Sequence, residues 1–374
     1  MRILLIDSTL HEPVSPLFLD AIRGLGCEYR FMDEGPFLQP LEKSLIHKIA
    51  YRLLHRRPPT YWAFNRTLLE EARRFHPHLM LAVKSPYIMP GVLRRIKEET
   101  GALLVNYATD DPFNKVNSTP DLIRGIPCYE LYASTKRAIM VDIRRAGCPH
   151  VAYVRFGYKP SVHFPEFPAT ESEAKRFQSD VVLIGGADND RLPYVEAISR
   201  LGDVSLALYG GYWTQYNHLR RYARGFAVGR DYRLALGGAK IALCLVRRAN
   251  RDGHAMRTFE IPACGAFMLA ERTDEHLELF KEDQHAAFFG SPEELLEKVR
   301  YYLVHEQVRQ NIATAGHERV TTGAHTYRDR LMEILEIAGA IEHPFSSIMA
   351  RTLSLTPAGR SKDTRSTHQE DHQP

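Results

Sequence analysis

Short strand-like stretches alternate with helical segments along the N-terminal part of the chain. Helices are expected at 16–26 and at about 90–100. The strand-like stretches are RILLID (2–7), EYRFMD (28–33), HLMLAV (78–83), ALLVNYA (102–108) and CYELYAS (128–134). Apolar strands separated by helices are typical of a parallel sheet that is covered on both faces. The pattern predicts a Rossmann-like domain.

A polar segment, PATESEAKRFQSD (168–180), interrupts this alternation, and a second series of strands follows it. These strands are VVLIGG (181–186), VSLALYGG (204–211), KIALCLV (240–246), AFMLAE (266–271) and AAFFG (286–290). The last helices are expected at 291–320 and 326–339. We therefore predict domains at 1–165 and 166–340, and a disordered tail at 345–374, where there is little to bury.

Composition narrows the class of protein. The length of 374 residues suits about two domains, and 44% hydrophobic with 25% charged residues is typical of a globular chain. A net charge of +4 without a long basic block favours a small anionic ligand over nucleic acid. The five cysteines lack C-x-x-C spacing, and no apolar run is long enough for a signal or membrane segment, so we expect a cytoplasmic protein without a disulfide frame.

Two glycine-containing turns follow strands of the second domain. Gly185 and Gly186 precede a helix, where free backbone N–H groups and the helix dipole favour a phosphate. The G-x-G-x-x-G fingerprint is absent, so a nicotinamide-linked oxidoreductase is not favoured, and a simple tight turn is the alternative. In LYGGYW (208–213), Tyr209 and Gly210 are candidates for contact with a nucleotide base, with core packing as the alternative.

The segment RTFEIPACG (257–265) predicts a short helix. Thr258 is expected to cap it, Pro262 to fall early enough to be tolerated, and Gly265 to end it. Glu260 then lies in the first turn, at an exposed helix start, where the helix dipole favours a carboxylate even without a ligand.

Charged residues upstream of this helix favour a ligand nevertheless. Asp252 and His254 lie close in sequence, together with Arg247, Arg251 and Arg257. Carboxylates accept hydrogen bonds from sugar hydroxyls, and arginine binds phosphate oxygens bidentately. A nucleoside diphosphate sugar needs both kinds of contact. Neither a catalytic triad nor a clustered metal-ligand spacing is found, so metal independence is expected.

RTFEIPACGAFMLAERTDEHLELF (257–280), with EELLEKVRYYL, RQNIATAGHERV and HTYRDR further on, resembles the spore-maturation (CgeB-type) glycosyltransferase-like proteins, relatives of the group 1 glycosyltransferases with the GT-B fold. NYATDDP (106–112) and VRFGYKPSVHFP (154–165) resemble the acidic loop and interdomain connection of that family. The resemblance covers most of residues 100–335. It implies an α/β GT-B protein whose two Rossmann-like domains, each with a parallel sheet, face a central cleft.

The resemblance also implies roles for individual residues. Glu260 would hold the ribose hydroxyls of the nucleotide, and Asp252 would contact the donor sugar at a position where Glu is commoner. From the residues alone, Arg257 and His254 are candidates for phosphate or sugar contacts. Asp110 and Asp111 follow a strand end and are candidates for a general base, with turn formation as the alternative.

The sequence thus predicts a glycosyltransferase that moves a sugar from a UDP-sugar or another nucleoside diphosphate sugar to a glycan, protein or small-molecule acceptor. The donor is a co-substrate, and no separate cofactor is expected. The resemblance implies retention of anomeric configuration. The alternative from another class is a non-catalytic GT-B module that binds a sugar nucleotide or glycan and acts as a partner protein.

Overall fold

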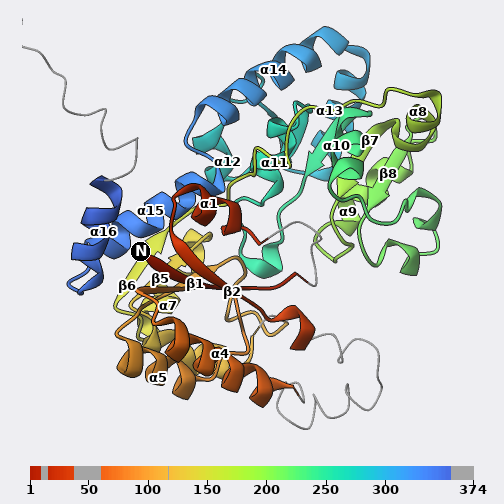
Figure 1. Cartoon of the computed structure of the whole chain (residues 1–374). Helices are drawn as coiled ribbons and strands as arrows, with labels where there is room; N and C mark the ends of the chain where they lie inside the picture. Colours follow the sequence, from red (N-terminus) through yellow and green to blue (C-terminus); the bar gives the residue numbers. More distant parts are fainter. Residues whose placement is uncertain (10–15, 38–59, 117, 355–374) are drawn as a thin grey trace, which may run out of the picture.

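Two parallel sheets with helices on both faces form the molecule (Figure 1). The computed structural model describes residues 1–9, 16–37, 60–116 and 118–354. The first sheet has the order β2 (Glu28–Asp33), β1 (Arg2–Asp7), β3 (Leu79–Val83), β4 (Leu103–Ala108), β5 (Leu131–Ser134) and β6 (His150–Tyr153). The second has the order β11 (Ala287–Phe289), β10 (Met268–Glu271), β9 (Ala239–Cys244), β7 (Ser179–Ile184) and β8 (Leu206–Tyr209). The predicted parallel α/β architecture is confirmed.

The first sheet is buried on both faces, as the apolar strands predict. Every position of β3 and β4 is buried, whereas the edge strand β2 is mostly exposed or half-buried. The helices of this unit are α1 (Leu19–Gly24), α4 (Tyr61–Phe75), α5 (Pro90–Thr100), α6 (Pro120–Gly125) and α7 (Met140–Arg145), with 3₁₀ turns η1 (Ile126–Cys128) and η2 (Arg137–Ile139). Helices α4, α5 and α7 pack on one face. Helix α4, which the sequence pattern did not reveal, contributes Phe64 and Leu68 to that core.

The second sheet is covered in the same way. The helices of this unit are α8 (Glu171–Phe177), α9 (Leu192–Ser199), α10 (Arg230–Gly237), α11 (Arg257–Ala263), α12 (Asp274–Leu279), α13 (Pro292–Val304) and α14 (Glu306–Thr322), with 3₁₀ turns η3 (Trp213–Gln215), η4 (Arg220–Tyr222) and η5 (Arg248–Asn250). Helices α10 and α11 pack on one face, and α9 and α13 on the other. Ser291 caps α13 by accepting from Glu294 N, and Pro292 occupies the first turn, so this helix begins where the sequence predicts. His305 separates α13 from α14, so the helix expected at 291–320 is two helices.

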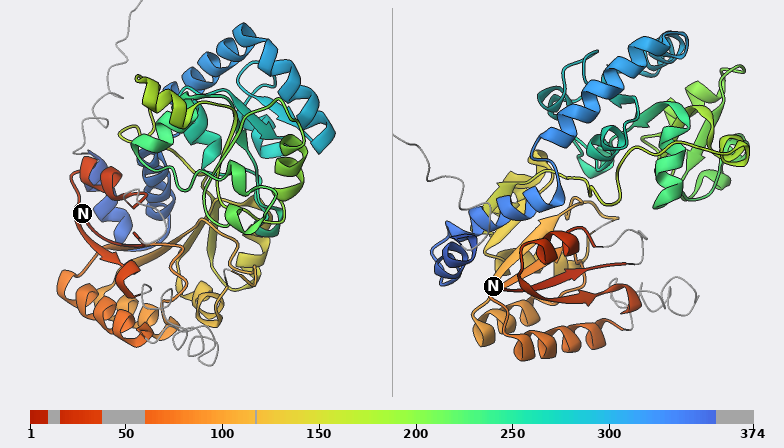
Figure 2. Two further views of the ribbon diagram at one scale, coloured as in Figure 1. Left: turned by 90° about the vertical axis from the view of Figure 1, so that its right-hand side faces the viewer. Right: turned by 45° about the horizontal axis from the view of Figure 1, so that its top comes forward.

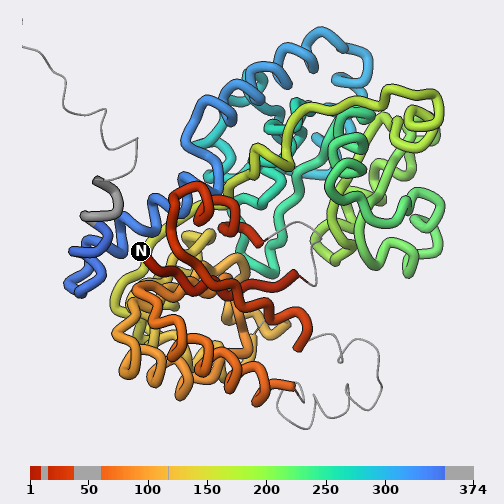
Figure 3. Tube along the Cα trace, viewed as in Figure 1, coloured from red at the N-terminus to blue at the C-terminus, as the bar shows by residue number. Residues whose placement is uncertain are grey.

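The C-terminal end of the chain returns to the first unit (Figure 3). Helix α15 (Tyr327–Gly339) packs with α1 on the second face of the first sheet, where Leu331 and Ile334 are fully buried. Helix α16 (Phe345–Ser354) follows it, and Phe345 is buried in the same core. Helix α15 lies in the predicted domain 166–340 but packs on the first sheet. The segment predicted as a disordered tail begins with helix α16. The remaining tail residues, 355–374, lie outside the described residues.

Two chain segments connect the units and lie side by side (Figure 2). Tyr158 N donates to His325 O at 3.1 Å, and Tyr327 N donates to Tyr158 O at 3.1 Å. At Gly157 a Cβ atom would lie 2.8 Å from His325 O, so a larger residue would separate the two segments. Two chain segments that are hydrogen-bonded to each other thus join the units; we call them the paired connection.

Strand order fixes where a ligand can bind. Numbered from its own first strand, the second sheet has the order 2-1-3-4-5, and the first sheet extends the same order by one strand. In such sheets the crevice opens at the carboxyl ends of the two strands between which the winding direction reverses. These are β1 and β3 in the first sheet, and β7 and β9 in the second.

Candidate active site

A cavity of about 440 Å³ lies between the two units at both of these reversal points. It is lined by Asp7 at the end of β1, Lys84 after β3, Gly185 after β7 and Arg247 after β9. A second cavity of about 200 Å³ lies within the second unit and is lined by Tyr209, Gly210 and the segment Phe226–Gly229. Both cavities are lined by Gly185, Gly186 and Arg257, so they meet at this wall.

Glu260 lines the smaller cavity and is 3% exposed. Its Oε2 accepts a hydrogen bond from Tyr232 OH at 3.0 Å and pairs with Arg257, and Nε2 of His163 lies 3.7 Å from Oε1. Burial raises the pKa of Glu260, but Arg257, His163 and Tyr232 outweigh that effect and hold the pKa below its ordinary value. The side chain is therefore an ionised acceptor of hydrogen bonds.

Helix α11 carries this carboxylate with a geometry that differs in part from the expectation. Glu260 lies in the first turn, but it is buried rather than exposed. Met256, not Thr258, is the N-cap residue; Thr258 lies inside the helix and accepts from Ala255 N at 3.0 Å. Pro262 falls in the last turn, and Gly265 with φ 72° ends the helix in the left-handed conformation that glycine favours.

Arginine side chains gather at the wall that the cavities share. Arg257 Nε donates to Ile184 O at 3.1 Å, and its guanidinium stacks over the Tyr232 ring at 5.2 Å. Arg191 donates from Nη1 to Gly186 O at 2.7 Å, and its Nε is buried with no hydrogen-bond partner among the described residues. Burial lowers the pKa of Arg191, and Asp188 opposes the shift. The wall thus presents two cations beside the glycine turn.

The glycine turn itself is tightly packed. Gly210, with φ 129°, lies so close to Gly185 that a Cβ atom there would be 2.5 Å from Gly185 C. Trp213 donates from Nε1 to Gly185 O at 2.8 Å, and both Trp213 and Tyr209 are buried. Trp213 therefore holds the turn, whereas Tyr209 also lines the smaller cavity.

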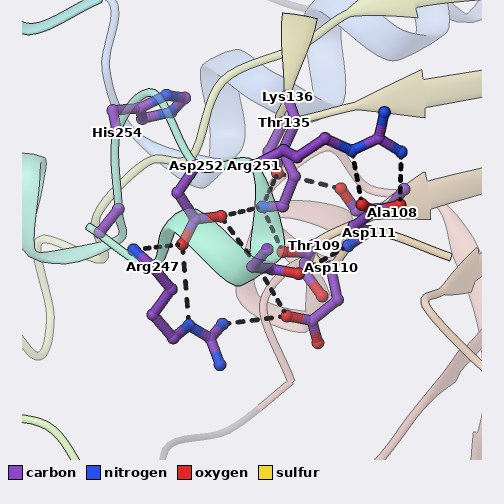
Figure 4. Close-up of polar contacts among 12 residues, drawn as sticks. Ala108, Thr109, Asp110, Asp111, Thr135, Lys136, Arg247, Arg251, Asp252 and His254 are labelled. Carbon is purple, nitrogen blue, oxygen red and sulfur yellow. Dashed lines mark hydrogen bonds and ion pairs between the residues drawn. The ribbon is translucent and has the colours of Figure 1, made fainter. Parts of the chain in front are cut away.

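Asp252 has different partners. Lys136, at the carboxyl end of β5, places Nζ 2.7 Å from Asp252 Oδ1, and both side chains are almost fully buried (Figure 4). Asn250 Nδ2 donates to the same oxygen at 2.8 Å, and Arg247 N donates to Oδ2 at 3.3 Å. The carboxylate predicted to contact the donor sugar lines the larger cavity but is bound by protein groups from both units. Its sugar-binding role stays a prediction.

Asp110 and Asp111 belong to the same set of contacts (Figure 4). Asp110 pairs with Lys84 at 2.5 Å and with Arg247 at 3.0 Å. Burial raises the pKa of Asp110, but Lys84 and Arg247 outweigh it and lower the pKa to about 2. Arg251 binds Asp111 through two nitrogens, at 2.6 and 3.0 Å. We call the loop 247–252 with Asp110, Asp111 and Lys136 the interdomain latch.

The general base expected in the acidic loop stays a prediction. A carboxylate with a pKa of about 2 is a weak proton acceptor near neutral pH, and Asp110 is already paired with Lys84 and Arg247. Asp111 is 3% exposed and also accepts from Phe113 N at 2.9 Å, which is the turn geometry considered as the alternative. Both aspartates therefore act in docking the units.

His254 is buried beside the latch and does not line either cavity. Phe156 N donates to its Nε2 at 3.2 Å, so Nδ1 carries the proton that faces Glu275 Oε2 at 2.5 Å. Burial lowers the pKa of His254, with Glu275 opposing the shift. The ring is held neutral between the two units and away from both cavities, and its predicted contact with phosphate or sugar stays a prediction.

Several residues of the site were not predicted from the sequence. Arg191 lies in the segment GGADNDR, shortly after the glycine turn, so this segment contained a usable indication. Tyr232 and His163 come from α10 and the connecting segment, and Lys136 lies far before Asp252 in the chain. Only the fold brings these side chains together. Within the described residues, no three His, Cys, Asp or Glu side chains form a candidate metal site.

Comparisons with known proteins agree with the fold described above. The sequence model of the glycosyl transferase-like family matches residues 191–336, which include α9, α11 and most of α15. Among solved structures, HepE of Anabaena in complex with UDP and glucose is similar with a TM-score of 0.61 and 12% identity, covering 91% of this chain and 100% of that chain. The chain has the GT-B fold.

Two further structures with this fold give the same result. Sucrose-phosphate synthase from Thermosynechococcus elongatus has a TM-score of 0.62 at 10% identity, covering 94% of this chain and 99% of that chain. A glycosyltransferase from Rickettsia africae ESF-5 has a TM-score of 0.58 at 14% identity, covering 90% and 97%. No curated protein sequence matches the chain. None of the helices in the described part of this GT-B chain is long and apolar enough to span a bilayer.

Proposed function

We propose that this protein is a glycosyltransferase that moves a sugar from a nucleoside diphosphate sugar to an acceptor. The observation that carries the proposal is the meeting of the two cavities at Gly185, Gly186 and Arg257. A nucleoside in the smaller cavity would place its diphosphate at this wall and its sugar in the larger cavity between the units. The domain match over 191–336 supports the same assignment.

Each wall residue has a role in this proposal. Glu260 accepts hydrogen bonds from the ribose hydroxyls, because it is ionised and lines the nucleoside cavity. Arg191 and Arg257 stabilise the charge that develops on the diphosphate as the glycosidic bond breaks. The backbone N–H groups of the glycine turn add to that stabilisation. The docked units exclude water, which otherwise competes as the acceptor.

UDP-glucose is the first donor to test, because HepE has been solved with UDP and with UDP-glucose. We further propose, from the CgeB-type resemblance, that transfer retains the anomeric configuration and needs no metal ion. NMR of the first product formed identifies its anomer before mutarotation. Retention predicts the donor's configuration, and the inverted anomer contradicts it.

The proposal is tested by thermal unfolding of the full chain with a panel of UDP, GDP, ADP and UDP-glucose. A nucleotide that binds only the folded chain raises its midpoint. Slow release of UDP from UDP-glucose should accompany binding and be lost in Glu260→Ala. Glu294→Gln is the matched control, since Glu294 also pairs with an arginine, Arg272, but lies outside both cavities. No binding of any nucleotide would sink the proposal.

One observation favours a second candidate, a non-catalytic module that binds a sugar nucleotide. Asp252, the acid implied to contact the donor sugar, is bound by Lys136, Asn250 and Arg247. Such a module would bind UDP-glucose without releasing UDP, across a broad set of acceptors. The cavity of about 440 Å³ between the units favours the enzyme, because it leaves room for a second substrate.

A further inference from the structure

The wall of the larger cavity that belongs to the first unit contains a buried carboxyl group that neither the sequence pattern nor the resemblance indicates. Glu34 follows β2, lines this cavity and is 5% exposed. Its Oε2 is buried and has no hydrogen-bond partner among the described residues. A buried polar atom without a partner destabilises the folded chain, so its persistence at a cavity wall indicates a group that a substrate completes.

The charged groups around Glu34 are mostly acidic. Asp7 is the last residue of β1, and Glu34 N donates to Asp7 O at 3.0 Å; Asp33 precedes Glu34 in the chain. Lys84, after β3, is the cation on this side, but its Nζ is 2.5 Å from Asp110 Oδ2. Burial and Asp7 raise the pKa of Glu34 to about 8, with Asp33 adding to the shift and Lys84 and Ser85 opposing it. Near neutral pH, Glu34 therefore holds a proton that a bound cation would displace.

The backbone next to this carboxyl is strained. Lys84 has φ 59° and Ser85 φ 39°, so two consecutive residues other than glycine occupy the left-handed region. Hydrogen bonds fix this arrangement: Lys84 N donates to Tyr107 O at 2.9 Å, and Asn106 Nδ2 donates to Lys84 O at 3.2 Å. The strained turn holds Lys84 in its pair with Asp110, at the side of the cavity that faces the latch.

The two walls of the cavity therefore differ in charge. The second unit contributes Arg191, Arg247 and Arg257, which suit a diphosphate, besides Asp252, which is paired with Lys136. The first unit contributes Asp7, Glu34 and the Lys84–Asp110 pair. We propose that Glu34 binds the acceptor by hydrogen bonds, and that the acceptor is a hydroxyl-rich molecule presenting a neutral or ammonium group, and no negative charge, to this wall. This inference rests on the proposed glycosyl transfer, because it assigns the donor to the opposite wall. An anionic acceptor would meet the negative charge of Asp7 and could not form an ion pair with Glu34, and like charges in contact weaken binding.

The test compares three sugars of different charge on the full chain saturated with UDP. Dissociation constants of glucosamine, glucose and glucuronate are measured by NMR titration. We expect glucosamine and glucose to bind at least about tenfold more tightly than glucuronate, which corresponds to about 1.4 kcal/mol. In Glu34→Gln the ratio of glucuronate to glucosamine constants should fall about tenfold, because glutamine cannot give up a proton to form the ion pair with the ammonium group.

The control is Glu130→Gln, which removes a carboxyl of similar burial at the opposite, amino edge of the same sheet. It should keep the wild-type ratio. UDP binding is measured on every sample, so a variant that fails to fold is recognised, and a wild-type chain that binds no UDP refutes the proposed function itself. If UDP binds, the present inference alone is overturned by glucuronate binding as tightly as glucosamine, by a ratio unchanged in Glu34→Gln, or by the absence of any sugar binding.

Discussion

The helix α11 region around Glu260 and the interdomain latch around Asp252 use the same chemistry in different settings. Each has a buried carboxylate held by cations and by hydrogen bonds. The partners of Glu260 come from α10, α11 and the connecting segment, and they border a cavity. The partners of Asp252 come from both units, and Lys136 reaches it from the first sheet.

This difference shows what a short motif determines. Asp252 and Glu260 place two carboxylates on one segment of the second unit, with Asp252 ahead of helix α11 and Glu260 in its first turn. Whether each one faces a ligand or a neighbouring unit depends on the strand ends that lie opposite. At Asp252 a lysine lies there, and the carboxylate docks the units; at Glu260 a cavity lies there. Experiments that disturb one region and read out the other can separate the two roles.

The largest effect is expected from Lys136→Met, which leaves the buried Asp252 without its lysine. Removing one partner of a buried ion pair typically costs about 3–5 kcal/mol of unfolding free energy. Denaturation with urea measures this loss. The double variant Lys136→Met/Asp252→Asn should recover part of it, since no unpaired charge remains. A double variant as unstable as the sum of both single variants would contradict the pairing.

The next effect distinguishes the two carboxylates by nucleotide affinity. Glu260→Gln should weaken UDP binding roughly 10- to 100-fold, because a hydrogen bond to a charged group contributes about 1.5–3 kcal/mol. Asp252→Asn should change UDP affinity by less than about twofold, since UDP lacks the donor sugar and a carboxylate already paired with a lysine adds little to the potential at the nucleotide. Isothermal titration measures both. Equal losses in the two variants would show that the latch is part of the nucleotide site.

Acid pH should lower the stability of the chain through His276, which is hydrogen-bonded to Thr258 in α11. His276 is fully buried between Glu271 O, 2.6 Å from Nδ1, and Thr258 Oγ1, 2.8 Å from Nε2. Burial lowers the pKa of His276 to about 4, below that of an unfolded histidine. The unfolded chain therefore takes up the proton first, and stability is lost as pH falls from about 6.5 toward 4.

For this one histidine the loss between pH 7 and pH 5 should be about 2 kcal/mol. Urea unfolding at the two pH values measures it. In His276→Gln, which is less stable at pH 7, the stability should depend less on pH over this range. An unchanged pH dependence in that variant would assign the acid sensitivity to other groups, such as His254.

The smallest effect is expected at the exposed edge of the interface. Arg137 pairs with Glu278 across the units, as Lys136 pairs with Asp252, but both side chains are 43% exposed. Exposed pairs are screened by water and contribute little. Arg137→Met should leave the urea midpoint nearly unchanged. A loss comparable to that of Lys136→Met would show that charge across the interface, rather than burial, governs docking.

The fold could be predicted largely from the chain, because buried parallel strands are apolar throughout. β1, β3 and β4, and all strands of the second sheet, fall within the predicted stretches or overlap them. The return of α15 and α16 to the first sheet was not predicted, since an amphipathic helix does not show which sheet it covers. For the same reason the predicted tail includes residues of α16.

The candidate site could be predicted only where its residues are neighbours in sequence. Gly185, Gly186, Arg257 and Glu260 do border a cavity. Arg247 lines the larger cavity, whereas Arg251 binds Asp111 and Asp142 instead. The lysines that pair with Asp252 and Asp110 follow other strands of the first sheet, β5 and β3. Long-range charge pairs leave no periodic signal in the chain, so their positions required the fold.

The paired connection between the units has a consequence for synthesis of the chain. The second unit is continuous from α8 to α14, whereas the core of the first unit includes α15 and Phe345. On the ribosome the first unit is therefore made first but completed last. One face of the first sheet stays partly uncovered until the whole second unit and the two helices after it have emerged. Exposed apolar surface is prone to aggregation, so chaperone binding to that face matters most during this interval.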